Sequence, residues 1–319
     1  MNRHHDSLIP ALRVVATQMD IADLCDVHTA RITDAELVAA VTPEDFPGLD
    51  PERVSFETIT ITPTSRGVRA PRVRIYRPRG VRGPLGTLIF AHGGAFCLGD
   101  LETDHLRCML YAQEADSIVV SVEYALAPES PYPAGLHDTV AALQWIAAEA
   151  DGLGVDSRRI AIGGESAGGC LAAAAALHCR DTGVVALRGQ MLLFPALDHR
   201  QQSVSMRDGA DMPAWNSVQS RLMWEHYLGG AGAVSAYAAP ALADDLRDLP
   251  AALVVTAQVD PLRDEALAYA GRLCEASVPT EIHNYPGTFH VFDAAAPALP
   301  VAQRAFAEQT AFLGSVLGV

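Results

Sequence analysis

The sequence predicts an α/β protein with an open, mostly parallel β-sheet. Continuous apolar runs at 88–91 and 118–122 are typical of parallel strands that are buried on both faces. Helical stretches follow such runs repeatedly, as they do in right-handed βαβ units. Earlier in the chain, 54–61 and 73–76 alternate apolar and polar residues. We therefore expect the sheet to begin with antiparallel strands that have one solvated face.

Residues 1–50 predict a helical arm, with apolar periodicity from Leu8 to Leu24 and a capping-type helix start at 33–36. The elements of the sheet follow from residue 53. Strands are expected at 54–61, 73–76, 88–91, 118–122, 159–162, 191–194, 253–257 and 281–285. Helices are expected at 103–115, 136–150, 170–177 and 264–276, and from about residue 300.

Residues 198–250 interrupt this alternation with a helical stretch near 217–227 and a glycine-rich stretch at 229–232. Because this insertion follows a strand, we expect it to lie over the carboxyl ends of the strands, where open α/β sheets bind ligands. The insertion is too short to be an independent domain. We therefore divide the chain into the arm, 1–50, and one domain, 51–319, and expect the arm and the insertion to form a cap.

The basic residues exclude several classes of function. All 23 are arginine, which rules out Schiff-base, pyridoxal-phosphate and Walker-type lysine chemistry. The formal net charge of −15 makes nucleic acid and anionic membranes unfavourable partners, because phosphate binding needs clustered cations. One run of arginines alternates along an apparent strand, and we interpret it as the solvated face of an edge strand. It comprises Arg66, Arg69, Arg72, Arg74, Arg77, Arg79 and Arg82.

The six cysteines are scattered without a Cys-x-x-Cys pair. This is typical of free thiols in a reducing compartment, and not of a disulfide framework or a zinc site. Residues 1–20 carry charges throughout and lack the apolar core of a signal peptide. The longest apolar stretch, 170–177, is too short to span a bilayer. We expect a cytoplasmic protein.

Gly164-Glu165-Ser166-Ala167-Gly168 lies between an apolar strand and an alanine-rich helix. A serine between two glycines at such a junction fits a nucleophile elbow. The turn forces the serine into a strained backbone conformation, and the glycines let neighbouring backbone pass without a Cβ clash. The serine hydroxyl then stands above the helix N-terminus, whose partial positive charge favours developing anions. Ser166 is therefore the candidate nucleophile.

A serine nucleophile needs a base and an orienting acid on the same edge of the sheet. His290 follows the last predicted strand and can reach Ser166, whereas His283 lies inside that strand. Asp260 ends a buried strand, whereas Asp264 falls in the first turn of the next helix, where an acid stabilises the helix dipole. The chain order serine, aspartate, histidine is that of hydrolases with a nucleophile elbow.

An oxyanion hole is the remaining requirement. The strand at 88–91 runs into His92-Gly93-Gly94-Ala95, where unhindered backbone can turn its N–H groups towards a substrate. Gly93, Gly94 or Ala95 would then act together with the N–H of Ala167.

The motifs at 92–96, 123–129, 164–169, 260–265 and 289–290 together resemble the hormone-sensitive-lipase-like branch of bacterial esterases. The resemblance covers residue 53 to the C-terminus. It implies an α/β-hydrolase fold with an eight-stranded sheet and a helical cap, hydrolysis of short-acyl carboxylic esters, and no metal or cofactor. It also implies a structural role for His92 as a brace of the oxyanion loop, and suggests a homodimer.

The match departs from the family pattern at three places. Alanine stands at 95 in place of a third glycine, Ala125 replaces the usual arginine, and Glu165 replaces a more common aspartate or threonine. For Glu165 we expect an acid at the helix start that is hydrogen-bonded to loop backbone, although a catalytic role is open.

Within the family, segments at 203–206, 213–215 and 224–228 look most like a heroin-esterase-like subgroup of acetylesterases. Candidate walls of the substrate pocket are Phe96, Met212, Trp215, Trp224 and Phe289.

The predicted function is hydrolysis of short-chain, acetyl-type esters by a Ser-His-Asp triad through an acyl-enzyme. The expected partner is thus a small ester molecule. Two alternatives remain open. The same triad could attack a lactone or an amide, or the chain could be a non-catalytic ligand-binding relative with this fold.

Overall fold

The computed structural model describes residues 3–19, 22–62, 69–230 and 232–318. Within these ranges eight strands form one sheet in the order β1-β2-β4-β3-β5-β6-β7-β8. The strands are β1 (Val54–Thr60), β2 (Arg72–Pro78), β3 (Leu85–Ala91), β4 (Ile118–Glu123), β5 (Val155–Glu165), β6 (Leu187–Leu193), β7 (Ala251–Val259) and β8 (Thr280–Phe289). β1 and β2 pair antiparallel, as do β2 and β4, whereas β4 and all later neighbours are parallel. The predicted sheet is therefore confirmed.

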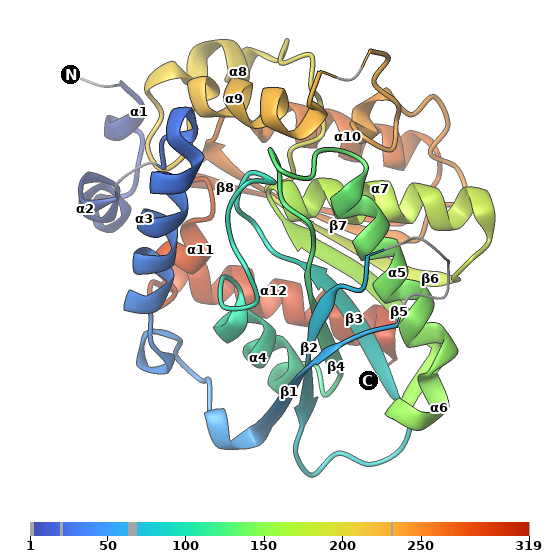
Figure 1. Cartoon of the computed structure of the whole chain (residues 1–319). Helices are drawn as coiled ribbons and strands as arrows, with labels where there is room; N and C mark the ends of the chain where they lie inside the picture. Colours follow the sequence, from blue (N-terminus) through green and yellow to red (C-terminus); the bar gives the residue numbers. More distant parts are fainter. Residues whose placement is uncertain (1–2, 20–21, 63–68, 231, 319) are drawn as a thin grey trace.

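Helices cover both faces of this sheet (Figure 1). α5 (Ala134–Ala148), α7 (Ala167–Thr182) and α10 (Arg263–Glu275) contribute to the apolar core on one face. α4 (His105–Glu114) and α12 (Pro300–Leu317) contribute to the core on the other. The other helices are α1 (Arg3–Asp6), α2 (Pro10–Gln18), α3 (Val27–Ala40), α6 (Ala150–Leu153), α8 (Val204–Asp208), α9 (Ser217–Leu228) and α11 (Phe292–Ala295).

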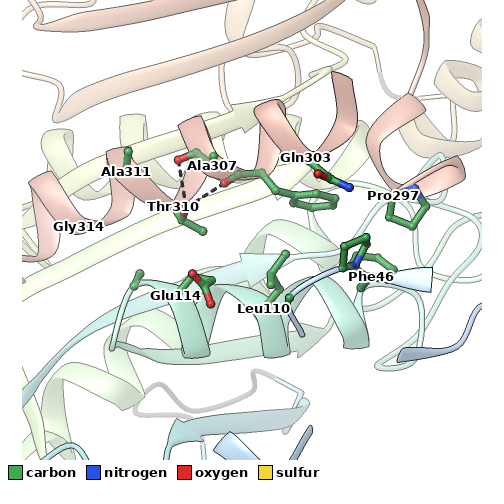
Figure 2. Close-up of a pocket in the computed structure, with 13 residues that line it drawn as sticks. Phe46, Leu110, Glu114, Pro297, Gln303, Ala307, Thr310, Ala311 and Gly314 are labelled. Atoms are coloured by element: carbon green, nitrogen blue, oxygen red, sulfur yellow. Dashed lines mark hydrogen bonds between the residues drawn. The ribbon is translucent and has the colours of Figure 1, made fainter. Parts of the chain in front are cut away.

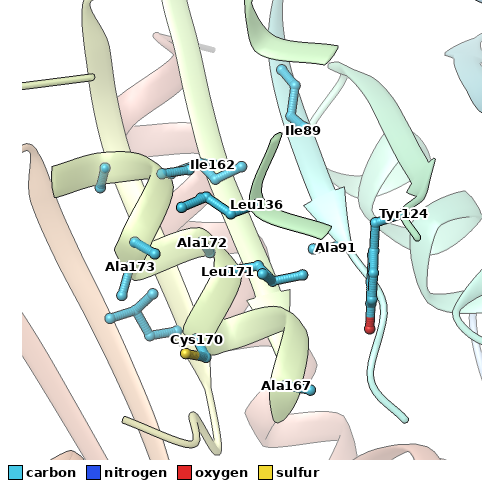
Figure 3. Packing of buried hydrophobic residues seen from close by; sticks show 14 of the residues in the cluster. Ile89, Ala91, Tyr124, Leu136, Ile162, Ala167, Cys170, Leu171, Ala172 and Ala173 are labelled. Carbon is cyan, nitrogen blue, oxygen red and sulfur yellow. The ribbon is translucent and has the colours of Figure 1, made fainter. Parts of the chain in front are cut away.

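α7 is the most deeply buried helix of the site region. Every residue from Ala167 to Leu177 is buried, and the alanine, cysteine and leucine residues of this stretch are at most 1% exposed. Figure 3 shows its small side chains, Ala172 and Ala173 among them, packed beside Ile162 of β5. Alanine side chains let this helix approach the central strands closely at the density of a protein interior. The helix behind Ser166 is thereby held rigidly against β5.

The arm and the insertion lie side by side along one end of the molecule, with α8 and α9 at the top of Figure 1 and α1 to α3 at its left. The backbone N–H of Leu24 donates to Gln219 Oε1 over 2.8 Å, and the ring Nε2 of His226 lies 2.9 Å from the carbonyl oxygen of Leu24. These contacts join the arm to α9.

The predicted helix start at 33–36 is wrong. α3 begins at Val27, and the side chain of Asp26 caps it by accepting the N–H of Thr29. No helix-breaking residue stands between these positions and 33, so the helix continues through the capping-type sequence. Asp34 is consequently an interior residue of α3 and not part of its cap.

The interpretation of the arginine run as one solvated edge face is also wrong. β2 lies between β1 and β4, and Arg74 is only 8% exposed. Its guanidinium donates to the Glu102 carboxylate over 2.6 and 2.9 Å. Arg69 donates to buried Asp138, and Arg66 lies outside the described residues. An alternating pattern can thus place a charge in the interior when a carboxylate from another element meets it.

Candidate active site

Ser166 lies at a tight turn between β5 and α7, as the sequence predicts. Its φ of +53° is in the left-handed region, which is uncommon and strained for a residue with a Cβ. A Cβ on Gly164 would lie 2.2 Å from the carbonyl oxygen of Gly168, and a Cβ on Gly168 would lie 2.0 Å from that of Ala91. Only glycine fits at either position. The close approach of these backbones holds the turn that presents the Ser166 hydroxyl.

Three side chains form a hydrogen-bonded row at this turn. Ser166 Oγ lies 3.0 Å from His290 Nε2, and His290 Nδ1 lies 2.7 Å from Asp260 Oδ2. The other carboxylate oxygen of Asp260 accepts the backbone N–H of Leu262 over 2.8 Å. All three side chains are buried. The carboxylate is therefore held by a second contact and can orient the imidazole, which in turn meets the hydroxyl.

The topology of the sheet explains how residues so far apart in sequence meet. β5, β7 and β8 are parallel members of the same sheet, and the row comes from the segments that follow their carboxyl ends. Asp260 directly follows β7, and His290 directly follows β8. The next residue, Val291, has a φ of +60°, so the chain turns sharply after the histidine.

The loop after β3 approaches the same turn. Gly94 has a φ of +108°, and Ala95 and Phe96 have φ values of +54° and +59°. In the described part of the chain the N–H groups of Gly94 and Ala95 donate to no other group. Ala167 is the first residue of α7, so its N–H has no acceptor within the helix. Among the described residues, the N–H groups of Gly94, Ala95 and Ala167 are therefore without a protein acceptor.

Gly93 differs from the other loop residues because its N–H already has an acceptor. It donates to Asp104 Oδ2 over 3.3 Å. Of the predicted oxyanion-hole donors, Gly93 is thus the one whose N–H is already hydrogen-bonded to a side chain of the protein.

His92 is completely buried under the loop. Its ring stacks on Tyr124 with 4.2 Å between the ring centroids, and its Nδ1 lies 2.6 Å from the carbonyl oxygen of Gly93. The Tyr124 hydroxyl donates to the carbonyl oxygen of His92 over 3.0 Å. Burial lowers the pKa of His92, so the ring is neutral. These contacts fit a brace and leave the ring out of reach of a substrate.

The five predicted pocket residues are all buried but fall into separate groups. Phe96 and Trp224 pack on each other with centroids 5.8 Å apart, next to the oxyanion loop. Trp215 lies 6.1 Å from the His290 ring. Met212 and Phe289 belong to the apolar core on the α4 and α12 face of the sheet.

Sequence reasoning missed one aromatic neighbour of the row. Phe194 lies 5.8 Å from the His290 ring. It directly follows β6, and its position after a strand is the signal that could have identified it.

Among the residues that the structure describes, Glu165 makes no hydrogen bond to loop backbone, so this expectation is wrong. Its Oε2 accepts from Arg107 Nη2 over 2.5 Å, and Arg107 also binds Asp104 and Asp293. We call these four residues the Arg107 cluster. Burial, and then the neighbouring Asp104, raise the pKa of Glu165. The available signal was Asp104-x-x-Arg107 at the start of α4, a spacing that places opposite charges on one helix face.

Asp34, in the interior of α3, has a raised pKa. Burial, and then Asp100 and Asp104, raise its pKa to about 6. Between about pH 4, where an unfolded aspartate ionises, and about pH 6, the folded protein holds a proton that the unfolded chain releases. The stability contributed by Asp34 is therefore present below this window and is lost as the pH rises through it.

Asp34→Asn is expected to melt above the wild-type temperature at pH 7 and to lose this advantage at pH 4. Thermal unfolding at both pH values measures the effect. Glu36→Gln, a charge removal at an exposed position of the same helix, is the control and should show no such trend. An Asp34→Asn advantage that is equal at both pH values would contradict the assignment.

A groove lies apart from this site. It has a volume of about 480 Å³, is lined by residues of α4 and α12 such as Leu110, Glu114 and Thr310 (Figure 2), and contains none of the predicted site residues. Among the described residues, no group of His, Cys, Asp and Glu side chains is arranged to hold a metal ion. Along the same residues, no helix is both long and apolar enough to cross a membrane.

The doubly covered sheet, the strained serine after a central strand and the row at the carboxyl ends of the strands define an α/β hydrolase. Residues 88–294 match the family described as having the alpha/beta hydrolase fold. The carboxylesterase NlhH of Mycobacterium tuberculosis is 35% identical over 291 residues, which cover 89% of this chain and 87% of that protein. The chain belongs to this family, within its hormone-sensitive-lipase-like branch, and its named relatives are ester-hydrolysing enzymes.

Two further similarities bear on the site. The solved structure of a bacterial heroin esterase superposes with a TM-score of 0.93 at 37% identity, and the match covers 98% of this chain and 99% of that one. The versiconal hemiacetal acetate esterase of Dothistroma septosporum is 32% identical over 232 residues, which cover 69% of this chain and 70% of that protein.

Proposed function

We propose that this ester-hydrolysing enzyme is a serine carboxylesterase that cleaves short-chain, acetyl-type esters through Ser166, His290 and Asp260. The observation that carries the proposal is the unbroken row from the strained serine through the imidazole to the buried carboxylate, with contacts of 3.0 and 2.7 Å. Both contacts are within the range in which a nucleophile, its base and an orienting acid work together.

The reaction begins when His290 Nε2 takes the hydroxyl proton of Ser166 as Oγ bonds to the ester carbonyl carbon. The carbonyl electron pair moves to its oxygen, which receives hydrogen bonds from the N–H groups of Gly94, Ala95 and Ala167. Gly93 is left out of this hole because its N–H already donates to Asp104. The alcohol leaves with the proton from His290, and an acyl group remains on Ser166.

Water repeats the sequence on the acyl-enzyme. His290 takes one of its protons, the resulting oxygen nucleophile attacks the acyl carbonyl, and Ser166 leaves with the proton from His290. Throughout both steps Asp260 accepts a hydrogen bond from the Nδ1–H of His290 and holds the ring in the tautomer whose Nε2 is free to act as a base.

The proposed preference for short acyl groups is supported by two observations. Bulky, buried rings lie around the row, with Phe194 and Trp215 both next to His290. In addition, two relatives of the chain are an acetate esterase and a heroin esterase. Large fixed aromatic walls favour small acyl groups because interiors at this density do not yield easily to added methylenes.

We also propose that the arm and the insertion act together as the cap of this site. The contacts of Leu24 with Gln219 and His226 tie the two segments into one unit. The cap would then exclude water from the row and set the width of the entrance.

A fluorophosphonate probe and a series of 4-nitrophenyl esters test the proposed function. We expect the probe to modify Ser166 alone, as located by peptide mass spectrometry. We also expect the acetate and butyrate esters to be hydrolysed faster than esters with longer acyl chains. Modification of another residue would overturn the assignment of the nucleophile. A complete lack of modification would instead support the non-catalytic relative.

Matched ester, lactone and anilide substrates separate the remaining alternatives. An alkoxide is a better leaving group than an amide nitrogen. If His290 is the only general acid that protonates the leaving group, the enzyme should therefore hydrolyse the ester faster than the anilide. Faster turnover of the lactone or the anilide would replace the ester assignment while retaining the same row of residues.

Asp260→Asn is expected to lower kcat by about 10⁴-fold, because an amide in place of the carboxylate favours the wrong tautomer of the base. Initial rates with 4-nitrophenyl acetate at saturating substrate measure the effect. Asp264→Asn, four residues further along and in the first turn of α10, is the control and should retain wild-type kcat. Equal rates for the two variants would contradict the role of Asp260.

A further inference from the structure

Arg107 is a buried arginine in the first turn of α4. Its side chain is 1% exposed, and all three guanidinium nitrogens are engaged. Nε donates to Asp104 Oδ1 over 2.8 Å, Nη2 to Glu165 Oε2 over 2.5 Å, and Nη1 to Asp293 Oδ2 over 3.1 Å. Such charge-assisted contacts are the strong class of hydrogen bond, and their fork geometry also fixes direction.

Each of the three carboxylates belongs to a different segment of the proposed active site. Asp104 accepts the N–H of Gly93 through its other oxygen, so it holds the oxyanion loop. Glu165 directly precedes Ser166, and its Oε1 lies 2.8 Å from the place where a Cβ on Gly93 would stand. Asp293 lies three residues beyond His290, in α11. One guanidinium therefore joins the oxyanion loop, the nucleophile turn and the histidine loop.

The cluster is supported from α4 and α12. Gln309 Nε2 donates to Asp293 Oδ2 over 2.9 Å, and the Tyr111 hydroxyl donates to Gln309 Oε1 over 2.6 Å. The ring of Phe306 lies 5.2 Å from the guanidinium carbon. Polar networks that are satisfied and buried in this way are rigid, because an alternative arrangement would leave a buried group unpaired.

The three carboxyl groups around Arg107 require a cation that can bind all of them at once. Asp104, Glu165 and Asp293 are 5%, 6% and 0% exposed, so three carboxyl groups share one cation in a site of low dielectric constant. Like charges at this spacing repel unless a cation lies between them. Lysine offers a point charge and cannot meet three directions at once, whereas the planar guanidinium can.

We propose that Arg107 is a positioning residue for the reaction, which holds the oxyanion loop, the Ser166 turn and the His290 loop at the spacing that catalysis needs. This inference rests on the proposed function. It assigns to a buried ion cluster the task of aligning three segments that the chain brings from separate strands. It also gives Glu165 a reason to stand beside the nucleophile without taking part in proton transfer.

The chain offers a matched pair of variants to test this role. Asp104 accepts one backbone N–H and one arginine, and it is buried. Asp138 also accepts one backbone N–H, that of Ala125, and one arginine, Arg69, and it is equally buried. Asp138 has no contact with the Arg107 cluster among those described. Loss of an ion pair made by a buried carboxylate is therefore common to both variants, whereas loss of alignment is specific to Asp104.

We expect Asp104→Ala to lower kcat for 4-nitrophenyl acetate by about 10²-fold, the scale of a misplacement of about 1 Å. KM should change by less than about threefold, because the substrate contacts are made by other residues and the loss is confined to the transition state. Modification of Ser166 by the fluorophosphonate should slow in parallel. Asp138→Ala should keep wild-type kcat even if it melts at a lower temperature.

Arg107→Lys and Asp104→Asn complete the experiment. The lysine variant should stay near the low kcat of Asp104→Ala, whereas asparagine, which can still accept the Gly93 N–H, should recover part of the loss. If Arg107→Lys does not fold, the Asp104 variants decide the question alone. Equal kcat for Asp104→Ala and Asp138→Ala would overturn the positioning role and leave the proposed function standing. Absence of ester turnover in the wild-type enzyme would overturn the proposed function itself.

Discussion

Ser166→Ala is expected to lower kcat for 4-nitrophenyl acetate by about 10⁶-fold, the scale of losing a serine nucleophile outright. The remaining residues cannot replace it, because His290 alone has no attacking oxygen to activate. The melting temperature should stay close to that of the wild type. Alanine keeps the Cβ that the strained turn already accommodates at a φ of +53°, and only one hydroxyl is lost. Steady-state rates and thermal unfolding of the same preparation measure both quantities.

Ser117→Ala is the matched control for this variant. Ser117 is also fully buried, and its hydroxyl has no partner among the described residues. Its removal should leave kcat unchanged. Residual turnover of Ser166→Ala within about a hundredfold of the wild type would show that the row of three residues is not the catalytic machinery.

Gly168→Ala is expected to produce the largest loss of stability of any single substitution considered for this chain. The added Cβ would lie 2.0 Å from the carbonyl oxygen of Ala91 and 2.4 Å from that of His92. Both obstacles are backbone, so α7 or the end of β3 would have to move. Overpacking of this severity belongs with the exceptional substitutions that cost more than about 4 kcal/mol. Urea unfolding at constant pH measures the free energy of unfolding.

Gly271→Ala provides a control of opposite sign. Gly271 lies in the interior of α10, and a Cβ there would meet no atom within 4 Å. Replacing a helix-interior glycine by alanine stabilises a helix by about 1 kcal/mol. A Gly168→Ala protein as stable as Gly271→Ala would contradict the close backbone approach at the nucleophile turn.

Local patterns in the sequence were sufficient for most of the fold. The apolar runs that became β3, β4, β5 and β7 are buried on both faces, and runs of this kind have few other stable arrangements. The nucleophile turn was equally local, because its glycines, strand and helix are contiguous in the chain. From the carboxyl-end rule for parallel strands, His290 and Asp260 could be placed on the same edge as Ser166 before their contacts were known.

The misplaced features share a different cause. Arg74 alternates along its strand as a solvated residue would, but contacts with Leu101 and Glu102 from a later loop hold its guanidinium in the interior. Residues 33–36 carry a capping sequence, but an earlier cap at Asp26 starts the helix first. Glu165 could be recognised as an acid beside the nucleophile, whereas its partner lies 58 residues away in sequence. No local pattern encodes a partner at that separation.

By itself, the sequence determined the succession of strands and helices along the chain, the strained serine turn and the chain order of serine, aspartate and histidine. These depend on hydrophobic periodicity and on glycine, which act over a few residues. Only the tertiary structure decided that Gly93 donates to Asp104, that Arg107 joins three segments of the site, and that burial and distant carboxylates raise the pKa of Asp34. Burial and charge pairing depend on which elements meet in space, and those contacts exist only once the whole sheet has assembled.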